Sequence, residues 1–382
     1  MSKQSQWALA RAPASVGNVA AGFDLLGHTF DGPFDEVLAR RSPQPGVRIT
    51  RITGCTVELP YEPARNTAGV AALALLESER LGFGVDLEIR KGIAFGAGLG
   101  GSAASSVAAV MAVNALHPEP LSREQLYPYA VSGEAASSGA RHGDNVGPML
   151  LGGLVMATPE RALPIPVPTG LFCAVVHPSC VLETRESRAV LVEPYPLHQV
   201  VCQTTFLAQL IAGSFRGDLG LLRAGLHDVL VEPRRAALVP GFARVKQSLL
   251  DAGALGGSLS GAGPSVFAWC ADKATAARVS EAMRTAFAEG GVASEGWVAP
   301  VDGPAAEVVE CGTLARAARA PTRESSKHSS QVWRRTAVCT YLSACPNSCQ
   351  VTLPDDSTRR PCASISSRRS SPAARWPERF PR

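Results

Sequence analysis

The sequence has 382 residues, which is enough for two domains with a substantial buried core. Its formal net charge is +4, but residues 312–382 hold 13 of the 37 Lys and Arg residues and only 4 of the 33 Asp and Glu residues. The rest of the chain is therefore mildly acidic, without the basic footprint of a nucleic-acid-binding protein, and no apolar run is long enough to cross a bilayer. We expect no nucleic-acid partner and no membrane partner.

Strand-like and helix-like segments alternate through the first 311 residues, as in α/β or α+β proteins. One helix should begin at Asn66 or Thr67, which are both good caps, and another at Ser122, where Gln125 completes a capping box. In this half we predict strands at residues 46–60, 85–89 and 152–157, and helices at residues 67–80, 102–116 and 122–137.

The proline-rich segment at residues 164–170 is typical of a domain connector. We therefore predict an N-terminal domain at residues 1–163 and a C-terminal domain at residues 164–311. In the second half the predicted strands are residues 171–176 and 265–270, and the predicted helices are residues 197–212 and 218–230.

Residues 312–382 differ in composition from the rest of the chain. They hold 12 serines, seven prolines and four cysteines, with no sustained period of 2 or 3.6 residues. Such a segment cannot bury enough apolar surface to offset its ordering entropy, so we predict a disordered basic tail rich in Ser, Arg and Pro. Two alternatives stay open, namely a basic arm that binds RNA or membrane and a reading-frame artefact.

Cysteine usage and the N-terminus indicate a compartment. The first residues lack the apolar segment of a secretory signal, and the cysteines of the body show no paired C-x-x-C spacing. Reduced thiols in a cytoplasmic protein are therefore expected, and a zinc site is not. These cysteines are Cys55, Cys173, Cys180, Cys202, Cys270 and Cys311.

Residues 91–106 form a glycine-rich turn that runs directly into an alanine-rich helix. Glycines let the backbone curl with its N–H groups inward, and the helix start adds unpaired amides, so the stretch predicts a polyphosphate site. No lysine follows Gly101, which excludes a P-loop. The spacing of Gly96, Gly98 and Gly101 fits the dinucleotide fingerprint, but no second strand ending in an acid follows, which disfavours that interpretation. A glycine hairpin that only packs on the helix is the remaining alternative.

Three further segments concentrate polar residues, at residues 13–24, 133–148 and 256–265. With the glycine-rich loop they resemble the GHMP small-molecule kinases, whose motifs P-A-S-x-x-N-x-x-x-G-F-D, G-L-G-x-S-A-A and S-G-x-G-P-[ST] occur here in the family's order. The segment S-S-G-A-R-H-x-D-N-V-x-P resembles the homoserine kinases within that superfamily. The resemblance covers roughly residues 7–310.

This resemblance implies a two-domain α+β GHMP kinase fold. An N-terminal domain like domain 2 of ribosomal protein S5 would carry the phosphate loop, and a ferredoxin-like C-terminal domain would close the cleft. The implied activity is ATP-dependent phosphorylation of L-homoserine to O-phospho-L-homoserine in threonine biosynthesis, by a cytoplasmic homodimer.

The resemblance also implies the sites for ATP and Mg²⁺. Asn66 would lie near the adenine. Ser102 and Glu134 would hold Mg²⁺, a hard cation that suits oxygen ligands completed by phosphate and water. The other ATP-binding positions would be Ala94, Phe95, Gly96, Ala97, Gly98, Leu99, Gly100, Gly101, Ala103 and Ala104, together with Ser102 itself.

Homoserine is a small zwitterion, and the family positions supply partners for both of its charges. Arg188 and Arg235 would bind the carboxylate, for which a bidentate guanidinium gives orientation as well as affinity. Asp24 would bind the ammonium group. Asn18, His142 and Thr184 would complete the substrate pocket.

Asn145 constrains the mechanism, because an amide can hydrogen-bond the substrate hydroxyl but cannot accept its proton. Together with Glu134 and Ser102 it would act by positioning and charge stabilisation, without a strong general base. The adjacent Asp144 is interpreted as structural. Some positions depart from the family: Ala94 replaces a proline, Gly101 replaces a serine, so that one phosphate or metal contact is lost, and the C-terminal ending is altered at Ala305 and Glu307.

Two alternative functions stay open. The chain could be another GHMP kinase, acting on mevalonate or a sugar, or a non-catalytic sensor of a metabolite. Arg188 together with Asp24 favours an amino acid, which needs both partners, and the presence of both Mg²⁺ ligands argues against a sensor.

Overall fold

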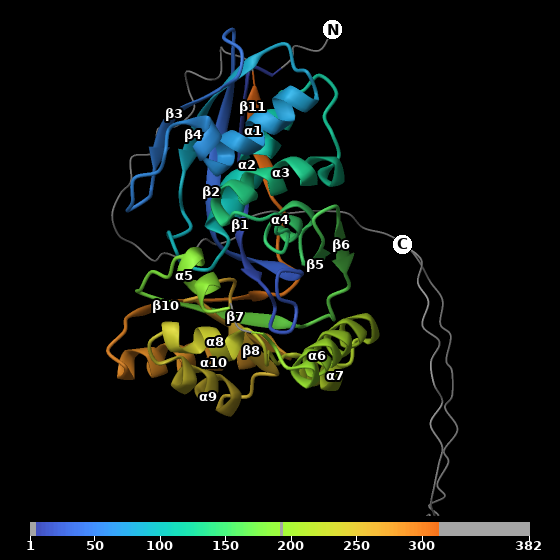
Figure 1. The fold of residues 1–382 in the computed structure, drawn as a ribbon, viewed down its shortest axis with the longest axis vertical. Coiled ribbons are helices and arrows are strands. Elements are labelled where there is room, and N and C mark those ends of the chain that lie inside the picture. The colour runs from blue at the N-terminus through green and yellow to red at the C-terminus, as the bar shows by residue number, and fades with distance from the viewer. Residues whose placement is uncertain (1–4, 192–193, 313–382) are drawn as a thin grey trace, which may run out of the picture. The chain divides into compact units, whose positions relative to one another are not determined.

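The computed structural model describes residues 5–191 and 194–312 (Figure 1). These residues form two β-sheets, one of seven strands and one of four. None of their helices combines the length and apolarity that crossing a membrane requires. The predicted tail lies outside the described residues, apart from Gly312.

The first sheet has the strand order β11-β1-β2-β4-β3, and β5 and β6 continue it from β2. Neighbouring strands are antiparallel except for β3 and β4, which are parallel. The strands are β1 (Trp7–Gly17), β2 (Leu26–Ser42), β3 (Val47–Thr53), β4 (Gly84–Arg90), β5 (Leu154–Ala157), β6 (Ala162–Ile165) and β11 (Glu307–Gly312).

Helix α2 is the centre of this part of the molecule. Every residue from Ala103 to Asn114 is buried, because its small side chains let α1, α3 and the first two strands approach closely. The predicted caps are confirmed: Asn66 caps α1, and Ser122 forms a capping box with Gln125 on α3. The helices are α1 (Thr67–Ser78), α2 (Gly101–Asn114), α3 (Arg123–Ser138) and α4 (Val146–Leu151), with a 3-10 turn η1 (Pro63–Arg65).

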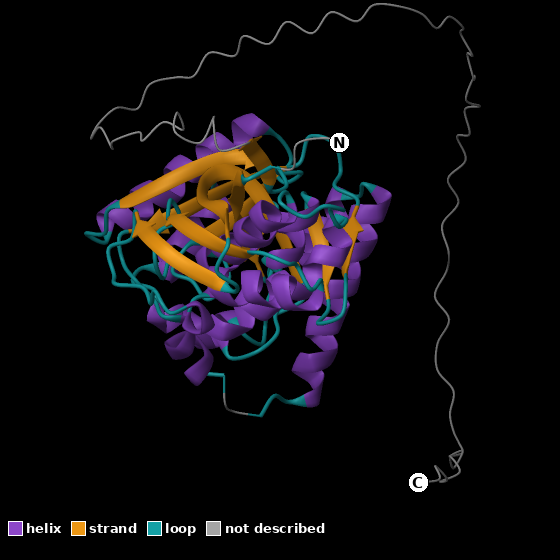
Figure 2. Ribbon diagram, turned by 90° about the horizontal axis from the view of Figure 1, so that it is seen from above, coloured by secondary structure: helices purple, strands orange, loops and turns teal. Residues whose placement is uncertain are grey.

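The second sheet has the order β10-β7-β9-β8 and is antiparallel throughout. With α9 and α10 packed on it, the β-α-β-β-α-β sequence of elements is ferredoxin-like, which confirms the predicted two-domain α+β fold. Figure 2 shows the helices packed beside the strands. The strands are β7 (Phe172–Pro178), β8 (Gly256–Leu259), β9 (Val266–Cys270) and β10 (Ser294–Pro300). The helices are α5 (Thr184–Ala189), α6 (Leu197–Arg216), α7 (Leu219–Gly225), α8 (Glu232–Arg235), α9 (Phe242–Asp251) and α10 (Lys273–Glu289), with a 3-10 turn η2 (Ala236–Leu238).

Some elements differ from the sequence-based predictions. Strands β1 and β2 were not predicted, and the strand expected at residues 46–60 ends at Thr53, because Gly54 turns the chain with φ +78°. The helix expected at residues 218–230 ends at Gly225. Beyond it, the Asp228 carboxylate accepts hydrogen bonds from the backbone N–H groups of Leu230, Val231 and Glu232. These bonds form a turn from which α8 begins.

The chain crosses between the sheets more than once. The expected domain boundary at residues 163 and 164 falls inside β6, which pairs with β5. The end of the described chain returns to the first sheet, where β11 pairs with β1 and Gly312 lies opposite Trp7. The six cysteines of the described residues form no disulfide.

A hydrogen bond joins the two sheets through a buried histidine. His28 on β2 is fully buried, and its Nε2 accepts from the indole N–H of Trp269 on β9 at 3.1 Å. Its Nδ1 lies 2.9 Å from the carbonyl of Thr29, so the neutral ring carries its proton on Nδ1. Burial is the main cause that lowers the pKa of His28 to about 4.

This histidine predicts a loss of stability in acid. The native pKa of about 4 lies below the ordinary histidine value of 6.5, so the unfolded state binds the proton first. The contribution of neutral His28 is complete above pH 6.5 and is lost as the pH falls towards 4, by about 3 kcal/mol in total. Urea unfolding from pH 7 to pH 4.5 should show the excess stability of the wild type over the His28→Gln variant shrinking with acid; a constant difference would contradict the assignment.

Candidate active site

The glycine-rich loop forms a curl of backbone amides. Gly96, Gly98 and Gly100 have φ values of +64°, +71° and +72°, and the residues between them do not. Such alternation turns successive N–H groups to the same side, as in anion-binding nests. A Cβ on Gly98 would lie 2.5 Å from the carbonyl oxygens of Ser260 and Gly263, so this position also excludes side chains.

The carbonyl groups of this loop are held by hydrogen bonds from the body of the protein. In a trans peptide the N–H points the opposite way from the C=O. A hydrogen bond to a loop carbonyl therefore points the N–H of the following residue away from the group that donates that bond. The carbonyls accept as follows: Gly96 from Leu182 N (3.2 Å), Ala97 from Ser265 Oγ (2.6 Å), Gly98 from Ser260 Oγ (2.7 Å), Leu99 from Ser15 N (3.1 Å) and Gly101 from Lys91 Nζ (2.6 Å).

The loop ends at the start of α2. Its cap residue, Gly100, has no side chain to accept a hydrogen bond from the first helical amides. These amides and the positive end of the helix dipole are therefore available to an anion. The loop and the helix start together form one donor-rich concavity.

A cleft of about 400 Å³ opens over this concavity. All but three of the residues that the sequence predicted for the site line it. The three others, Leu99, Ala103 and Ala104, place their side chains in the core. The predicted residues in the lining are Asn18, Asp24, Asn66, Ala94, Phe95, Gly96, Ala97, Gly98, Gly100, Gly101, Ser102, Glu134, His142, Asn145, Thr184, Arg188 and Arg235.

Ser102 and Glu134 face each other from α2 and α3. Glu134 is only 9% exposed, and burial is the main cause that raises its pKa to about 7, opposed by a hydrogen bond with the Ser102 side chain. A buried carboxyl beside a hydroxyl, at the mouth of a phosphate-binding loop, is a donor pair that suits Mg²⁺.

Asp24 lies at the other end of the cleft between a guanidinium group and an imidazole ring. Arg188 binds it in bidentate fashion, with Nη2 at 2.8 Å from Oδ1 and Nη1 at 3.2 Å from Oδ2. His142 Nδ1 lies 3.3 Å from Oδ2, and burial lowers the pKa of this histidine. The Nε2 atom of His142 is buried and has no hydrogen-bond partner among the described residues.

A strained turn places Asp24 there. Asn18, Val19 and Ala20 have φ values of +71°, +38° and +55°, a conformation that a β-branched residue such as Val19 rarely adopts. The turn is held by the side chain of Asn18, which accepts from Asp24 N at 3.0 Å and donates to Gly261 O at 2.7 Å. The hydrogen bonds described for Asn18 thus go to the protein.

Arg235 is 2% exposed and lines the same end of the cleft. Its Nε donates to Ser187 O at 3.1 Å and its Nη1 to Gly261 O at 3.0 Å. Burial, with a smaller effect of the charge on Arg188, lowers its pKa to about 10. Two carbonyls thus hold the guanidinium in place while it borders the cavity.

Asn145 and Asp144 lie between these two ends. Asn145 Oδ1 accepts from the Ser15 hydroxyl at 2.7 Å, and Asp144 accepts from the backbone N–H of Asn18 at 3.1 Å. Burial is the main cause that raises the pKa of Asp144 to about 7, followed by the charge of Asp24. Asp144 lines the cleft as well as supporting the strained turn.

Asn66 and Lys91 show what the sequence did and did not reveal. Asn66 lines the cleft, but its side chain accepts from Ala68 N and donates to Pro60 O. Lys91, which the sequence did not single out, also lines the cleft. Its one local signal is its place two residues after a strand-like run, as the first residue of the glycine-rich stretch.

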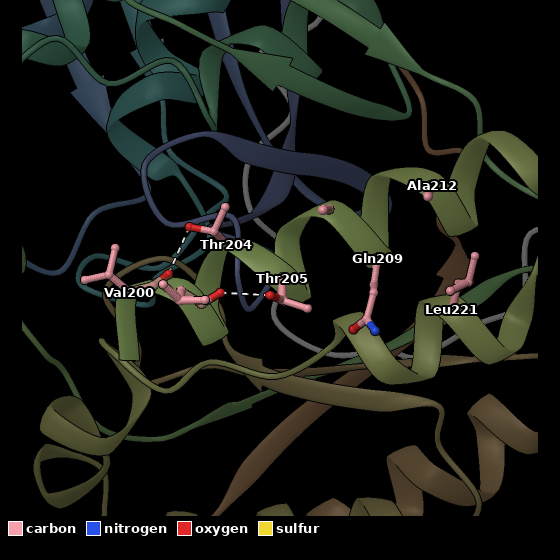
Figure 3. Close-up of a pocket in the computed structure, with 8 residues that line it drawn as sticks. Val200, Thr204, Thr205, Gln209, Ala212 and Leu221 are labelled. Carbon is pink, nitrogen blue, oxygen red and sulfur yellow. Dashed lines mark hydrogen bonds between the residues drawn. The ribbon is translucent and has the colours of Figure 1, made fainter. Parts of the chain in front are cut away.

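A second hollow, of about 520 Å³, lies on the outer face of α6 and α7 (Figure 3). Leu197, Val201 and Phe215 of α6 are 77%, 58% and 62% exposed, and the hydroxyls of Thr204 and Thr205 donate to carbonyls within the helix. We call this surface the α6 face. The residues that line its hollow are Val200, Val201, Thr204, Thr205, Ala208, Gln209, Ala212 and Leu221.

Comparison with known proteins identifies both halves of the chain. The profile of the GHMP kinases N terminal domain matches residues 66–153, and that of the GHMP kinases C terminal domain matches residues 208–289. The homoserine kinase of Xanthomonas campestris is 55% identical over 302 residues, covering 79% of this chain and 94% of that protein. The homoserine kinase of Chlorobium phaeobacteroides is 42% identical over 314 residues, covering 78% and 98%.

Solved structures agree with this result. The crystal structure of homoserine kinase from Cytophaga hutchinsonii superposes with a TM-score of 0.78 at 38% identity, covering 81% of this chain and 99% of that one. The mevalonate kinase of L. major, solved with R-mevalonate, is 17% identical with a TM-score of 0.58 and shows the shared fold alone. The resemblance seen in the sequence is confirmed, and the chain belongs to the homoserine kinases of the GHMP kinase family.

Proposed function

We propose that this protein transfers the γ-phosphoryl group of ATP to the side-chain hydroxyl of L-homoserine and forms O-phospho-L-homoserine, a step in threonine synthesis. The observation that carries the proposal is that one cleft holds a curl of backbone amides and a cluster of Asp24, Arg188 and Arg235. The amides suit a polyphosphate, and the cluster suits a small zwitterion.

The ATP would lie along the loop at residues 94–104, with its base towards Asn66 and the neighbouring Leu59 and Pro60, which also line the cleft. Its phosphates would meet the amides at the start of α2. Ser102 and Glu134 would hold Mg²⁺, which when bound would neutralise charge on the phosphates.

The substrate would meet the existing ion pair. Its ammonium group would bind Asp24, and its carboxylate would bind Arg188 and Arg235. Each charge of the substrate would then lie beside an opposite charge of the protein. Thr184, His142 and Asn18 complete this end of the cleft. Asn145 would hold the substrate hydroxyl, and because an amide takes up no proton, catalysis would rest on alignment and charge stabilisation.

The test of the function is direct. Phosphorus NMR of a mixture of ATP, Mg²⁺, L-homoserine and enzyme should show a phosphomonoester formed in step with ADP. Release of ADP should be fast with homoserine and near background with serine, mevalonate and galactose. Fast turnover of mevalonate or galactose, or none with any alcohol, would refute the proposal.

We further propose two domains, at residues 1–163 and 164–311, with β11 returning to the first sheet, and a tail at residues 312–382 that catalysis does not need. A chain ending after Gly312 keeps β11, whose last residue pairs with Trp7. We expect this truncated chain to retain the kcat, both KM values and the melting temperature of the full chain. Loss of folding on truncation would contradict the proposal.

We also propose that the enzyme is a cytoplasmic homodimer. Its six described thiols are free, which suits a reducing compartment. A second copy is the occupant that fits the α6 face, because α6 has no acidic or basic residue before Arg216, other than His198. Such a surface repels no copy of itself, and it offers no acidic groups to the basic tail and few cations to a lipid surface.

The dimer can be tested by placing a charge on that surface. Sedimentation equilibrium should give a dimer for the wild type and a monomer for Val201→Glu, because the new carboxylate would be buried in the interface without a partner. Leu250→Glu, on the exposed side of α9, is the matched control and should remain dimeric. A monomeric wild type, or a dimeric Val201→Glu variant, would remove the α6 face from this role.

A further inference from the structure

Beneath the phosphate loop lies a buried carboxylate that the kinase mechanism above does not use. Asp35, on β2, is fully buried. Its Oδ1 accepts the backbone N–H groups of Gly92 and Ile93 at 3.0 and 3.1 Å. Its Oδ2 accepts from the Ser105 hydroxyl at 2.7 Å and from the ammonium group of Lys91. One carboxylate therefore binds the residues just before the loop and a residue in the first turns of α2.

Lys91 extends this contact to the end of the loop. Its Nζ also donates to Gly101 O at 2.6 Å and to Ser105 Oγ at 2.8 Å, so all three of its protons have partners. Its side chain is 8% exposed. The carbonyl of Gly101 is thus held by a cation whose own position depends on Asp35.

We propose that Asp35 is a positioning residue for ATP. With Lys91 it forms a buried ion pair, here called the strut, which holds both ends of the phosphate loop against β2 and so fixes the direction of the loop amides. The inference rests on the proposed function, because it assigns Asp35 to the same ATP site. Asp35 itself makes its contacts behind the loop and acts through the groups that it holds.

A neighbouring ion pair provides a matched control. Glu36 on β2 and Arg90, the last residue of β4, occupy paired positions and are the chain neighbours of Asp35 and Lys91; their side chains meet at 3.5 Å. Both are partly exposed, and neither lines the cleft. Adjacent strand residues point to opposite faces, so this pair joins the same strands without contacting the loop.

The experiment compares Asp35→Asn with Glu36→Gln. The amide that Asp35→Asn introduces can still accept from backbone N–H groups but cannot form an ion pair with Lys91. We expect Asp35→Asn to raise the KM and the Kd for ATP by about tenfold or more, because a hydrogen bond between charged groups is lost. The KM for homoserine and the Kd for adenosine should stay within about twofold of the wild-type values. Glu36→Gln should leave all four constants within about twofold.

The outcomes separate three explanations. An unchanged Kd for ATP in folded Asp35→Asn would overturn the proposal, and so would equal weakening of ATP and adenosine, which would indicate general damage. If Asp35→Asn does not fold, Ser105→Ala removes the helix end of the strut with a smaller change; it should weaken ATP about threefold, and unchanged ATP binding would overturn the proposal. A wild type that binds ATP without phosphorylating homoserine would refute the proposed function and leave the comparison of ATP affinities intact.

Discussion

We expect the Glu134→Gln variant to lose about 10³-fold or more in kcat at saturating ATP and homoserine. Glutamine keeps the size of the side chain and can still hydrogen-bond with Ser102. It removes the charged oxygen that would hold Mg²⁺ at a buried position, where water cannot easily replace a ligand. The measurement is steady-state ADP release over a range of Mg²⁺ concentrations.

The control for this variant lies on the same helix. Glu124, in the first turn of α3, is exposed, and Glu124→Gln should leave the rate and the Mg²⁺ requirement unchanged. Binding of homoserine to the Glu134→Gln variant should also be retained, since its partners lie at the other end of the cleft. If the variant keeps kcat within tenfold of the wild type at the same Mg²⁺ concentration, Glu134 is not a metal ligand.

The second large effect is expected at Arg188. Arg188→Ala should raise the KM for homoserine by about 10²-fold, because the substrate carboxylate loses a bidentate partner and Asp24 loses its counter-charge. The KM for ATP should change by less than about threefold, since the phosphate loop is held by other residues. The KM of Arg188→Lys for homoserine should lie between those of the wild type and Arg188→Ala, because an ammonium group keeps the positive charge but lacks the bidentate geometry of the guanidinium.

Arg234→Ala is the matched control for Arg188→Ala. Arg234 donates to Leu230 O and stacks over Tyr195 with 3.9 Å between its Cζ and the ring centre, and it does not line the cleft. Its replacement should leave both KM values near those of the wild type. Equal increases in both KM values for Arg188→Ala would remove Arg188 from the substrate pocket.

Sequence alone predicted the parts of this site that are local. The loop at residues 94–101 could be recognised because glycine spacing and an alanine-rich continuation encode the curl and the helix within one short stretch. Asp24, Arg188 and Arg235 were predicted from family motifs, and the structure brings all three to one cleft. Their roles in binding homoserine remain predictions.

The parts that sequence did not predict depend on long-range contacts. Ser260 and Ser265 hold the carbonyls of Gly98 and Ala97 from 162 and 168 residues away, and only the folded chain shows which face of the loop they occupy. Asp35 on β2 and Lys91, directly after β4, are 56 residues apart and look like ordinary charged residues until β2 and β4 pair. Strand β2 escaped prediction because Gly32, Pro33 and charged residues interrupt its apolar alternation.

The return of β11 has a consequence for how the protein unfolds. The chain starts in one sheet, builds the other, and then supplies an edge strand to the first one again. The second sheet is thus inserted in the chain between two parts of the first, and apolar residues of both sheets share one buried cluster, so both halves should melt together. Calorimetry of the chain ending after Gly312 should show a single heat-absorption peak, although multi-domain proteins can unfold in more than one transition.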